Sequence, residues 1–212
     1  GNTVVLKPSS DSPTIAAKFV ELTEEVGLPP GVLNFLTGSA APGEAMVTHP
    51  KPRFISFTGS KGVGLHINEE AAKTRDGQKW IKRVVAELGG KDAIIVTDDA
   101  DIDSAAAGIV SAAFGFQGQK CSACSRLIVD EKVHDELVEK VVSLTESLRI
   151  GQPAEGDTNV SAVINKRSFD TTLNYIKKGT EEGGEVLIGG TGDDTNGYFI
   201  QPTVIANVQP GA

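Results

Sequence analysis

The chain has 212 residues, with 20 Lys and Arg against 28 Asp and Glu and a formal net charge of −8 at pH 7. This acidic balance argues against a nucleic-acid-binding protein, because neutralising phosphates requires a basic surface. No apolar stretch approaches the roughly 18–20 residues that cross a bilayer, and two cysteines are too few for a disulfide-stapled secreted scaffold. We therefore expect an intracellular protein with a small-molecule partner, in the bacterial cytoplasm rather than the mitochondrial matrix.

The first part of the chain alternates short apolar strands with helices. A helix start is indicated by Ser12 followed by Pro13, and Gly27 with the following prolines ends that helix. Its apolar side chains fall on one face: Ile15, Ala16, Phe19, Val20, Leu22 and Val26. The other expected elements are strands at 3–7, 32–36 and 53–57, a helix near 42–48, and a helix ending at about 74. This βαβαβ order predicts an α/β fold with a parallel, doubly wound sheet.

The rest of the chain continues in the same style and predicts a second doubly wound α/β unit. Its expected elements are strands at 80–87, 93–96 and 126–129, helices at 103–114, 131–149 and 166–182, and strands near 185–188 and 198–206. The Gly89-Gly90 pair is the natural hinge, which divides the chain into 1–88 and 89–212. Strand 3–7 begins almost at the first residue, and the chain stops just after a predicted strand. We therefore expect a piece of a longer protein.

Two loops with glycines could hold an anion. The loop FTGSKGVG (57–64) follows a strand and precedes a helix, whose first N–H groups are available to a phosphate. It is neither a Walker A loop nor a G-x-G-x-x-G fingerprint, so on the loop alone a plain β–α turn is the better interpretation. The region around Gly38 and Gly43 is a weaker candidate of the same kind.

The polar segment FQGQKCSACSR (116–126) carries both cysteines. A partly exposed Cys121 could act as a nucleophile, because a neighbouring cation such as Lys120 favours the thiolate form. Three alternatives compete with this interpretation. Cys121 and Cys124 could form a redox pair, although the strand-to-helix context of such a pair is missing. They could supply half a zinc site, although the three histidines show no paired spacing. A buried, inert thiol is as good an interpretation as a nucleophile.

Glu87 ends an apolar strand just before the glycine pair. A carboxylate in such a place could act as a base, although solvated Glu residues at strand ends are much commoner. Together with a nucleophilic cysteine, it would suit acyl-enzyme chemistry, in which water must be activated to release the product.

Four motifs in this order resemble the aldehyde dehydrogenase superfamily: LKPSS (6–10), FTGS (57–60), VAELGGK (85–91) and GQKCSACSR (118–126). The resemblance extends over essentially the whole chain. The stretches WIKRVVAELGGKDAIIV and FGFQGQKCSACSR are most similar to the members that oxidise glutamate γ-semialdehyde. The resemblance implies a Rossmann-like cofactor domain over 1–88 and part of a catalytic domain over 89–212. It also implies an enzyme that assembles as a homo-oligomer and holds no metal.

The resemblance assigns roles residue by residue. Cys121 would attack the aldehyde, and Glu87 would activate the water that hydrolyses the resulting thioester. Lys120 and Ser122 would contact the substrate. The implied cofactor is NAD, and NADP stays open because Ser10 stands where many NAD-preferring relatives carry Glu. The cofactor-binding positions would be Lys7, Ser10, Gly38, Gly43, Thr58, Gly59, Ser60, Val63, Leu88 and Gly89.

The family's oxyanion-hole Asn and the Glu that holds the nicotinamide ribose belong to segments outside this sequence. We therefore expect little or no turnover from the isolated chain. Two other functions stay open: oxidation of a different semialdehyde, and a non-catalytic nucleotide-binding fragment with an inert Cys121. A zinc-binding C-x-x-C protein is a distant third.

Overall fold

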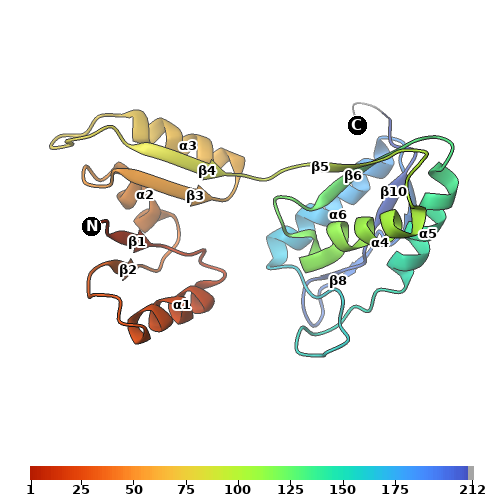
Figure 1. Cartoon of the computed structure of the whole chain (residues 1–212), viewed down its shortest axis with the longest axis horizontal. Coiled ribbons are helices and arrows are strands. Elements are labelled where there is room, and N and C mark those ends of the chain that lie inside the picture. Colours follow the sequence, from red (N-terminus) through yellow and green to blue (C-terminus); the bar gives the residue numbers. More distant parts are fainter. Residues whose placement is uncertain (210–212) are drawn as a thin grey trace. The chain divides into compact units, whose positions relative to one another are not determined.

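The computed structural model describes residues 1–209. The chain forms two compact units, Gly1–Leu88 and the residues from Gly89 onward (Figure 1). The division falls at the Gly89-Gly90 pair. No helix within the described residues is long and apolar enough to span a membrane.

The first unit contains three helices and four strands, and every element expected over 1–87 is present. In chain order they are β1 (Val4–Leu6), α1 (Pro13–Glu25), β2 (Leu33–Phe35), α2 (Ala40–Thr48), β3 (Phe54–Thr58), α3 (Lys61–Ala72) and β4 (Arg83–Glu87). The predicted α/β class and the parallel strand direction are confirmed. The strands pair two by two, β1 with β2 and β3 with β4, and no ladder among residues 1–88 joins β2 to β3.

Helix α1 begins at Pro13 as predicted, but its apolar face is not covered. None of its residues is buried, and the side chains of Ile15 and Val26 are 73% and 83% exposed. The spacing of apolar residues therefore predicts the helix correctly, whereas the burial of the face depends on contacts that the first unit does not supply.

Helices α2 and α3 are joined by an ion pair between Glu44 and His66, whose Oε2 and Nε2 atoms lie 2.8 Å apart. The hydrogen bond to the Glu44 carboxylate, followed by its charge, raises the pKa of His66 above its ordinary value of 6.5. A folded-state pKa above the unfolded one means that the pair stabilises the fold fully below pH 6.5. This contribution is lost as the pH rises through the folded-state pKa.

We therefore expect Glu44→Gln to return the titration of His66 toward its ordinary range, because the main cause of the shift is removed. NMR titration of the His66 imidazole resonances in the wild type and in the variant measures this change. A His66 curve that is unchanged in the variant would show that Glu44 does not set the shift.

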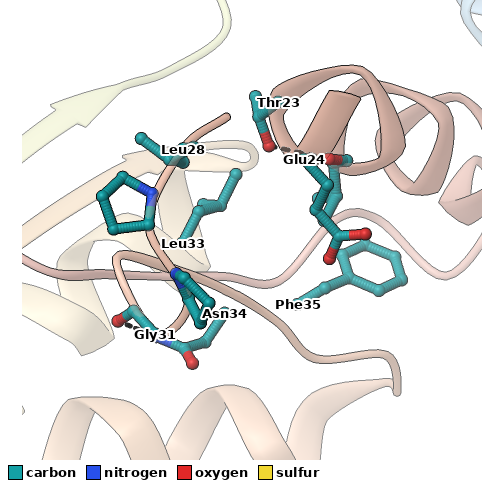
Figure 2. Close-up of a pocket in the computed structure, with 10 residues that line it drawn as sticks. Thr23, Glu24, Leu28, Gly31, Leu33, Asn34 and Phe35 are labelled. Carbon is teal, nitrogen blue, oxygen red and sulfur yellow. Dashed lines mark hydrogen bonds between the residues drawn. The ribbon is translucent and has the colours of Figure 1, made fainter. Parts of the chain in front are cut away.

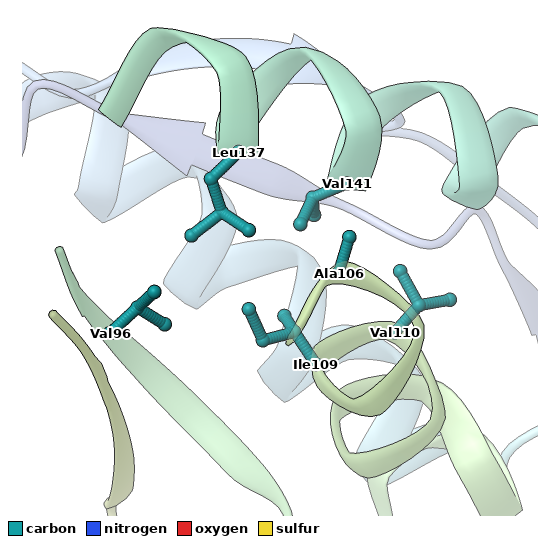
Figure 3. Close-up of a cluster of buried hydrophobic side chains, with 6 residues drawn as sticks. All are labelled: Val96, Ala106, Ile109, Val110, Leu137 and Val141. Atoms are coloured by element: carbon teal, nitrogen blue, oxygen red, sulfur yellow. The ribbon is translucent and has the colours of Figure 1, made fainter. Parts of the chain in front are cut away.

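The second unit is built around two helices packed on a parallel pair of strands. Its elements are β5 (Asp92–Val96), α4 (Ile102–Phe114), the 3₁₀ turn η1 (Gly115–Gly118), β6 (Cys124–Val129), α5 (His134–Glu146), α6 (Lys166–Glu181), β7 (Glu185–Ile188), β8 (Gly192–Asp193), β9 (Phe199–Ile200) and β10 (Val204–Ala206). Strands β5 and β6 are parallel, whereas β7 with β10 and β8 with β9 are antiparallel. Figure 3 shows the core between β5, α4 and α5: Val96, Ala106, Ile109, Val110, Leu137 and Val141.

Three expectations for the second unit are corrected. The strand expected over 198–206 is divided into β9 and β10, because Pro202 has no N–H to donate to a ladder. Helix α5 starts at His134 rather than at 131, since the backbone N–H of Val133 turns back to Asp130 O (3.2 Å). Strand β6 starts at Cys124, two residues earlier than expected, so Cys124 lies in the sheet rather than in the preceding loop.

Candidate active site

Cys121 lies in the short loop between η1 and β6 and is exposed to solvent. The loop turns through a hydrogen bond from Ala123 N to Lys120 O (3.2 Å), and Ala123 itself is buried. Cys124, the first residue of β6, is half-buried and its Sγ donates to Arg126 O (3.4 Å). The two cysteines therefore differ in access: a reactant can reach Cys121, whereas Cys124 is engaged in the sheet.

The backbone that leads into this loop is strained. Phe116 and Gln117 have φ values of +57° and +56°, in the left-handed region that side chains other than glycine rarely adopt. Such conformations persist only where the surroundings hold them, and they concentrate at functional sites. The strain lies four and five residues before the Cys121 thiol.

Gly90 comes directly against the Cys121 backbone. A Cβ atom built on Gly90 would lie 2.6 Å from the Cys121 carbonyl oxygen, closer than real Cβ atoms approach any neighbour. The absence of a side chain at the second glycine of the predicted hinge therefore lets the chain pass close to the loop that carries Cys121.

The two predicted substrate-binding residues flank Cys121 and are both exposed. The Lys120 ammonium extends back over η1, where Nζ lies 3.5 Å from the position that a Cβ on Gly115 would occupy. A cation and a hydroxyl group thus stand on either side of the thiol in the sequence, open to a small polar molecule.

Glu87 belongs to the first unit, at the end of β4, and it is exposed rather than enclosed by apolar side chains. It pairs in register with Thr58, and its carbonyl oxygen accepts a hydrogen bond from Gly59 N (3.0 Å). The structure thus brings Glu87 together with the loop that precedes α3. Cys121 belongs to the second unit.

The loop from β3 into α3 has the features of an anion site. Ser60 is the N-cap of α3, and its Oγ accepts from Val63 N (3.4 Å). A Cβ on Gly59 would lie 2.5 Å from the Phe57 ring, and one on Gly64 would lie 2.6 Å from a Leu88 methyl group. These glycines let α3 start close to the strands, and the N-terminus of such a helix offers N–H groups to a phosphate.

A second group of predicted cofactor residues meets at the end of β1. Lys7 Nζ donates to Gly38 O (3.0 Å) and to Pro8 O (2.7 Å). A Cβ on Gly43 would lie 3.5 Å from Lys7 Cε, and Gly38 has a φ of +132°, which disfavours any other residue. Of the remaining candidates, Ser10 lies in the exposed turn before α1, and Val63 is 48% exposed in the first turn of α3.

These residues fit a dinucleotide in chemical terms. A helix N-terminus with a serine cap suits a pyrophosphate, and a lysine ammonium next to two glycines suits ribose hydroxyl groups.

A cavity of the first unit lies elsewhere, between the end of α1 and β2 (Figure 2). Its volume is about 360 Å³, and its lining includes Glu24, Leu28 and Phe35 but none of the predicted cofactor residues. Asn34 points toward Gly31 and donates to Gly31 O (3.0 Å). With one carboxylate and no cation in its wall, the cavity does not suit an anionic cofactor.

Gly64, Gly90 and the two glutamines that precede Cys121 were not predicted from the sequence as residues of the candidate site. A signal was present in each case, because all four lie within the quoted motifs, but their contacts involve residues distant in sequence. Within residues 1–209, no three His, Cys, Asp or Glu side chains gather as metal ligands.

Comparison with known proteins places these features in one family. The model of the aldehyde dehydrogenase family matches residues 1–212. A curated relative, 1-pyrroline-5-carboxylate dehydrogenase from Bacillus subtilis (strain 168), is 54% identical over 213 residues, which cover 100% of this chain and 41% of that protein. The chain therefore spans less than half the length of the curated relative.

Solved structures agree. The crystal structure of 1-pyrroline-5-carboxylate dehydrogenase from Thermus with bound NAD superposes with a TM-score of 0.95 at 46% identity, covering 100% of this chain and 41% of that one. The γ-glutamyl-γ-aminobutyraldehyde dehydrogenase from Burkholderia cenocepacia J2315 gives 0.90 at 36% identity, covering 97% of this chain and 41% of that one. The chain belongs to the aldehyde dehydrogenase family.

Proposed function

We propose that this chain is the cofactor- and nucleophile-bearing part of a longer NAD-dependent enzyme that oxidises glutamate γ-semialdehyde, the open form of 1-pyrroline-5-carboxylate, to glutamate in proline degradation. The observation that carries the proposal is the 54% identity to a 1-pyrroline-5-carboxylate dehydrogenase over the whole chain. Residues 1–88 form part of the NAD-binding domain in this proposal, and 89–212 form part of the catalytic domain. The complete enzyme is a homo-oligomer.

The chemistry proceeds on Cys121. Its thiolate attacks the aldehyde carbon, a C–S bond forms, and the carbonyl oxygen becomes an oxyanion that the Cys121 backbone N–H helps to hold. NAD, when bound, would accept a hydride from the same carbon, which would leave a thioester on Cys121. Glu87 then takes a proton from water, and the hydroxide attacks the thioester. The C–S bond breaks, which releases the carboxylic acid and regenerates the Cys121 thiolate, and Glu87 afterwards gives its proton to bulk water.

The described residues divide the binding work between them. Ser60, with Thr58 and Gly59, holds the pyrophosphate at the start of α3, and Val63 packs near the adenine. Lys7 binds ribose hydroxyl groups between Gly38 and Gly43, and Leu88 with Gly89 lies near the nicotinamide. Lys120 and Ser122 recognise the polar end of the substrate. Ser10 lies near the adenosine ribose. Its neutral hydroxyl group, unlike a carboxylate, does not repel the additional phosphate of NADP, so both NAD and NADP are compatible with this position.

The test uses the complete enzyme that contains this chain. We expect NAD⁺ reduction with glutamate γ-semialdehyde at a kcat/KM well above that with γ-glutamyl-γ-aminobutyraldehyde, and no measurable turnover from residues 1–212 alone. Preference for the second aldehyde would keep the chemistry and overturn the substrate. Inactivity with every aldehyde would overturn the enzymatic proposal, and robust turnover by the 212-residue chain would overturn its predicted inactivity.

A further inference from the structure

The two glutamines before Cys121 connect the nucleophile loop to a distant segment of the second unit. Gln119 Oε1 accepts a hydrogen bond from Ile164 N (3.0 Å), across 45 residues of sequence. Gln117, with its amide oriented to satisfy both of its neighbours, accepts from Ser161 N (3.0 Å) and donates to Phe116 O (3.1 Å). Two backbone N–H groups of one segment are thus satisfied by side chains of the loop.

The segment that receives these hydrogen bonds is itself held in place. Val163 N donates to Tyr198 O (2.9 Å), and Val160 is buried and bridges to Ile150. At its far end, Asn165 caps α6 by accepting from Ser168 N (2.9 Å). The glutamines therefore bind a segment that is itself held to the rest of the unit by hydrogen bonds.

The loop requires such support. Phe116 and Gln117 hold left-handed backbone conformations, which relax unless neighbouring contacts maintain them. Gln119 lies two residues before Cys121, and the backbone N–H of Gln119 donates to Phe116 O (3.1 Å). Its amide oxygen is thus the long-range contact nearest in sequence to the nucleophile among the described side chains.

We propose that Gln119 is a positioning residue for Cys121, which it acts on through the hydrogen bond to Ile164, with Gln117 as its partner at Ser161. The inference rests on the proposed function of Cys121 as nucleophile. Gln119 does not touch the substrate in this account. Its loss therefore lowers the rate of the chemical step and leaves substrate binding largely intact, because a shift of about 1 Å in a reacting group costs on the order of 100-fold.

Two variants of the complete enzyme separate the hydrogen bond from the bulk of the side chain. Gln119→Leu keeps the size and removes the acceptor, so we expect kcat to fall about 10- to 100-fold with little change in KM. Gln119→Glu keeps an acceptor oxygen and adds a charge near the thiol. We expect its activity to approach that of the wild type at high pH, with the acid limb of the pH profile moved upward. Gln152→Leu, at an exposed residue of the same unit, is the matched control.

Hydrogen–deuterium exchange gives a second readout that requires no substrate. In Gln119→Leu, exchange should become faster within 115–123 and at the Ile164 amide, and it should stay unchanged in α4 and α5. Unchanged exchange overturns the inference whatever the activity. Faster exchange with an unchanged kcat also overturns it, while the wild-type turnover leaves the proposed function standing. A wild-type enzyme inactive with every aldehyde overturns the proposed function and this inference together, and the exchange data then show the contact without a catalytic role.

Discussion

Replacing Cys121 with alanine is expected to reduce aldehyde-dependent NAD⁺ reduction by the complete enzyme by about 10⁴-fold or more, because Cys121 forms the covalent intermediate in the proposed mechanism. Cys124→Ala is the matched control, and it should keep most of the activity. Cys124 is half-buried in β6, and its thiol donates to the Arg126 carbonyl, so its loss removes a weak hydrogen bond and a small packing volume.

Thiol labelling checks the same distinction without substrate. Iodoacetamide should alkylate Cys121 faster than Cys124, since only Cys121 is exposed and the thiolate must reach the reagent. Peptide mass spectrometry after short exposures gives both rates from one sample. Faster labelling of Cys124, or full activity in Cys121→Ala, would exclude Cys121 as the nucleophile.

Local sequence signals were sufficient to predict most of the helices. Pro13 begins α1 as predicted. In the structure, Asp101 and Asn165 cap α4 and α6 by accepting hydrogen bonds from Ser104 N and Ser168 N (both 2.9 Å), although neither cap was predicted. These signals act within one turn of the chain, so they can be read without knowing the fold.

The burial of apolar faces could not be predicted in this way. The run DAIIV in β5 indicates a strand covered on both faces. Ile94 and Val96 do pack on the core, but Ile95 and its neighbour Ile128 in β6 are 71% and 53% exposed. The apolar face of α1 behaves in the same way. A pattern identifies which face is suited to burial, whereas coverage depends on contacts with other elements that the pattern does not specify.

Some features of the candidate site have a local sequence signal, whereas others depend on contacts between residues that are distant in sequence. Glycines and serines in the loop before α3 indicate an anion site by themselves, and a polar loop indicates a reachable thiol. The role of Lys7 came only from family resemblance, since a lysine at a strand end has no local signature. Glu87 was a weak candidate base by its position at the end of an apolar strand, and the resemblance strengthened that interpretation. The contact of Lys7 with Gly38 spans 31 residues, and that of Gln119 with Ile164 spans 45. Such contacts are set by the fold and cannot be read from spacing.

Gly90 makes such a long-range contact, so adding a single methyl group at this residue should have a large effect on stability and on kcat. A Cβ at this residue would lie 2.6 Å from Cys121 O and 3.2 Å from the nearest Asp92 carboxylate oxygen. The carboxylate can rotate away, whereas the Cys121 carbonyl oxygen belongs to the backbone and can move only with the loop that carries Cys121. We expect Gly90→Ala to destabilise the fold by about 1–3 kcal/mol and to lower kcat on the order of 100-fold.

Gly108→Ala is the control, because Gly108 lies inside α4 with open space around its Cβ position. There the same substitution should leave kcat unchanged and raise stability by about 0.5–1 kcal/mol, since glycine is unfavourable inside a helix. Thermal unfolding and steady-state kinetics of the complete enzyme measure both quantities. A Gly90→Ala enzyme with wild-type kcat would show that the Cys121 loop can retreat from the added methyl group without cost. The activity of Cys121 would then not depend on the close packing of its loop against the glycine pair.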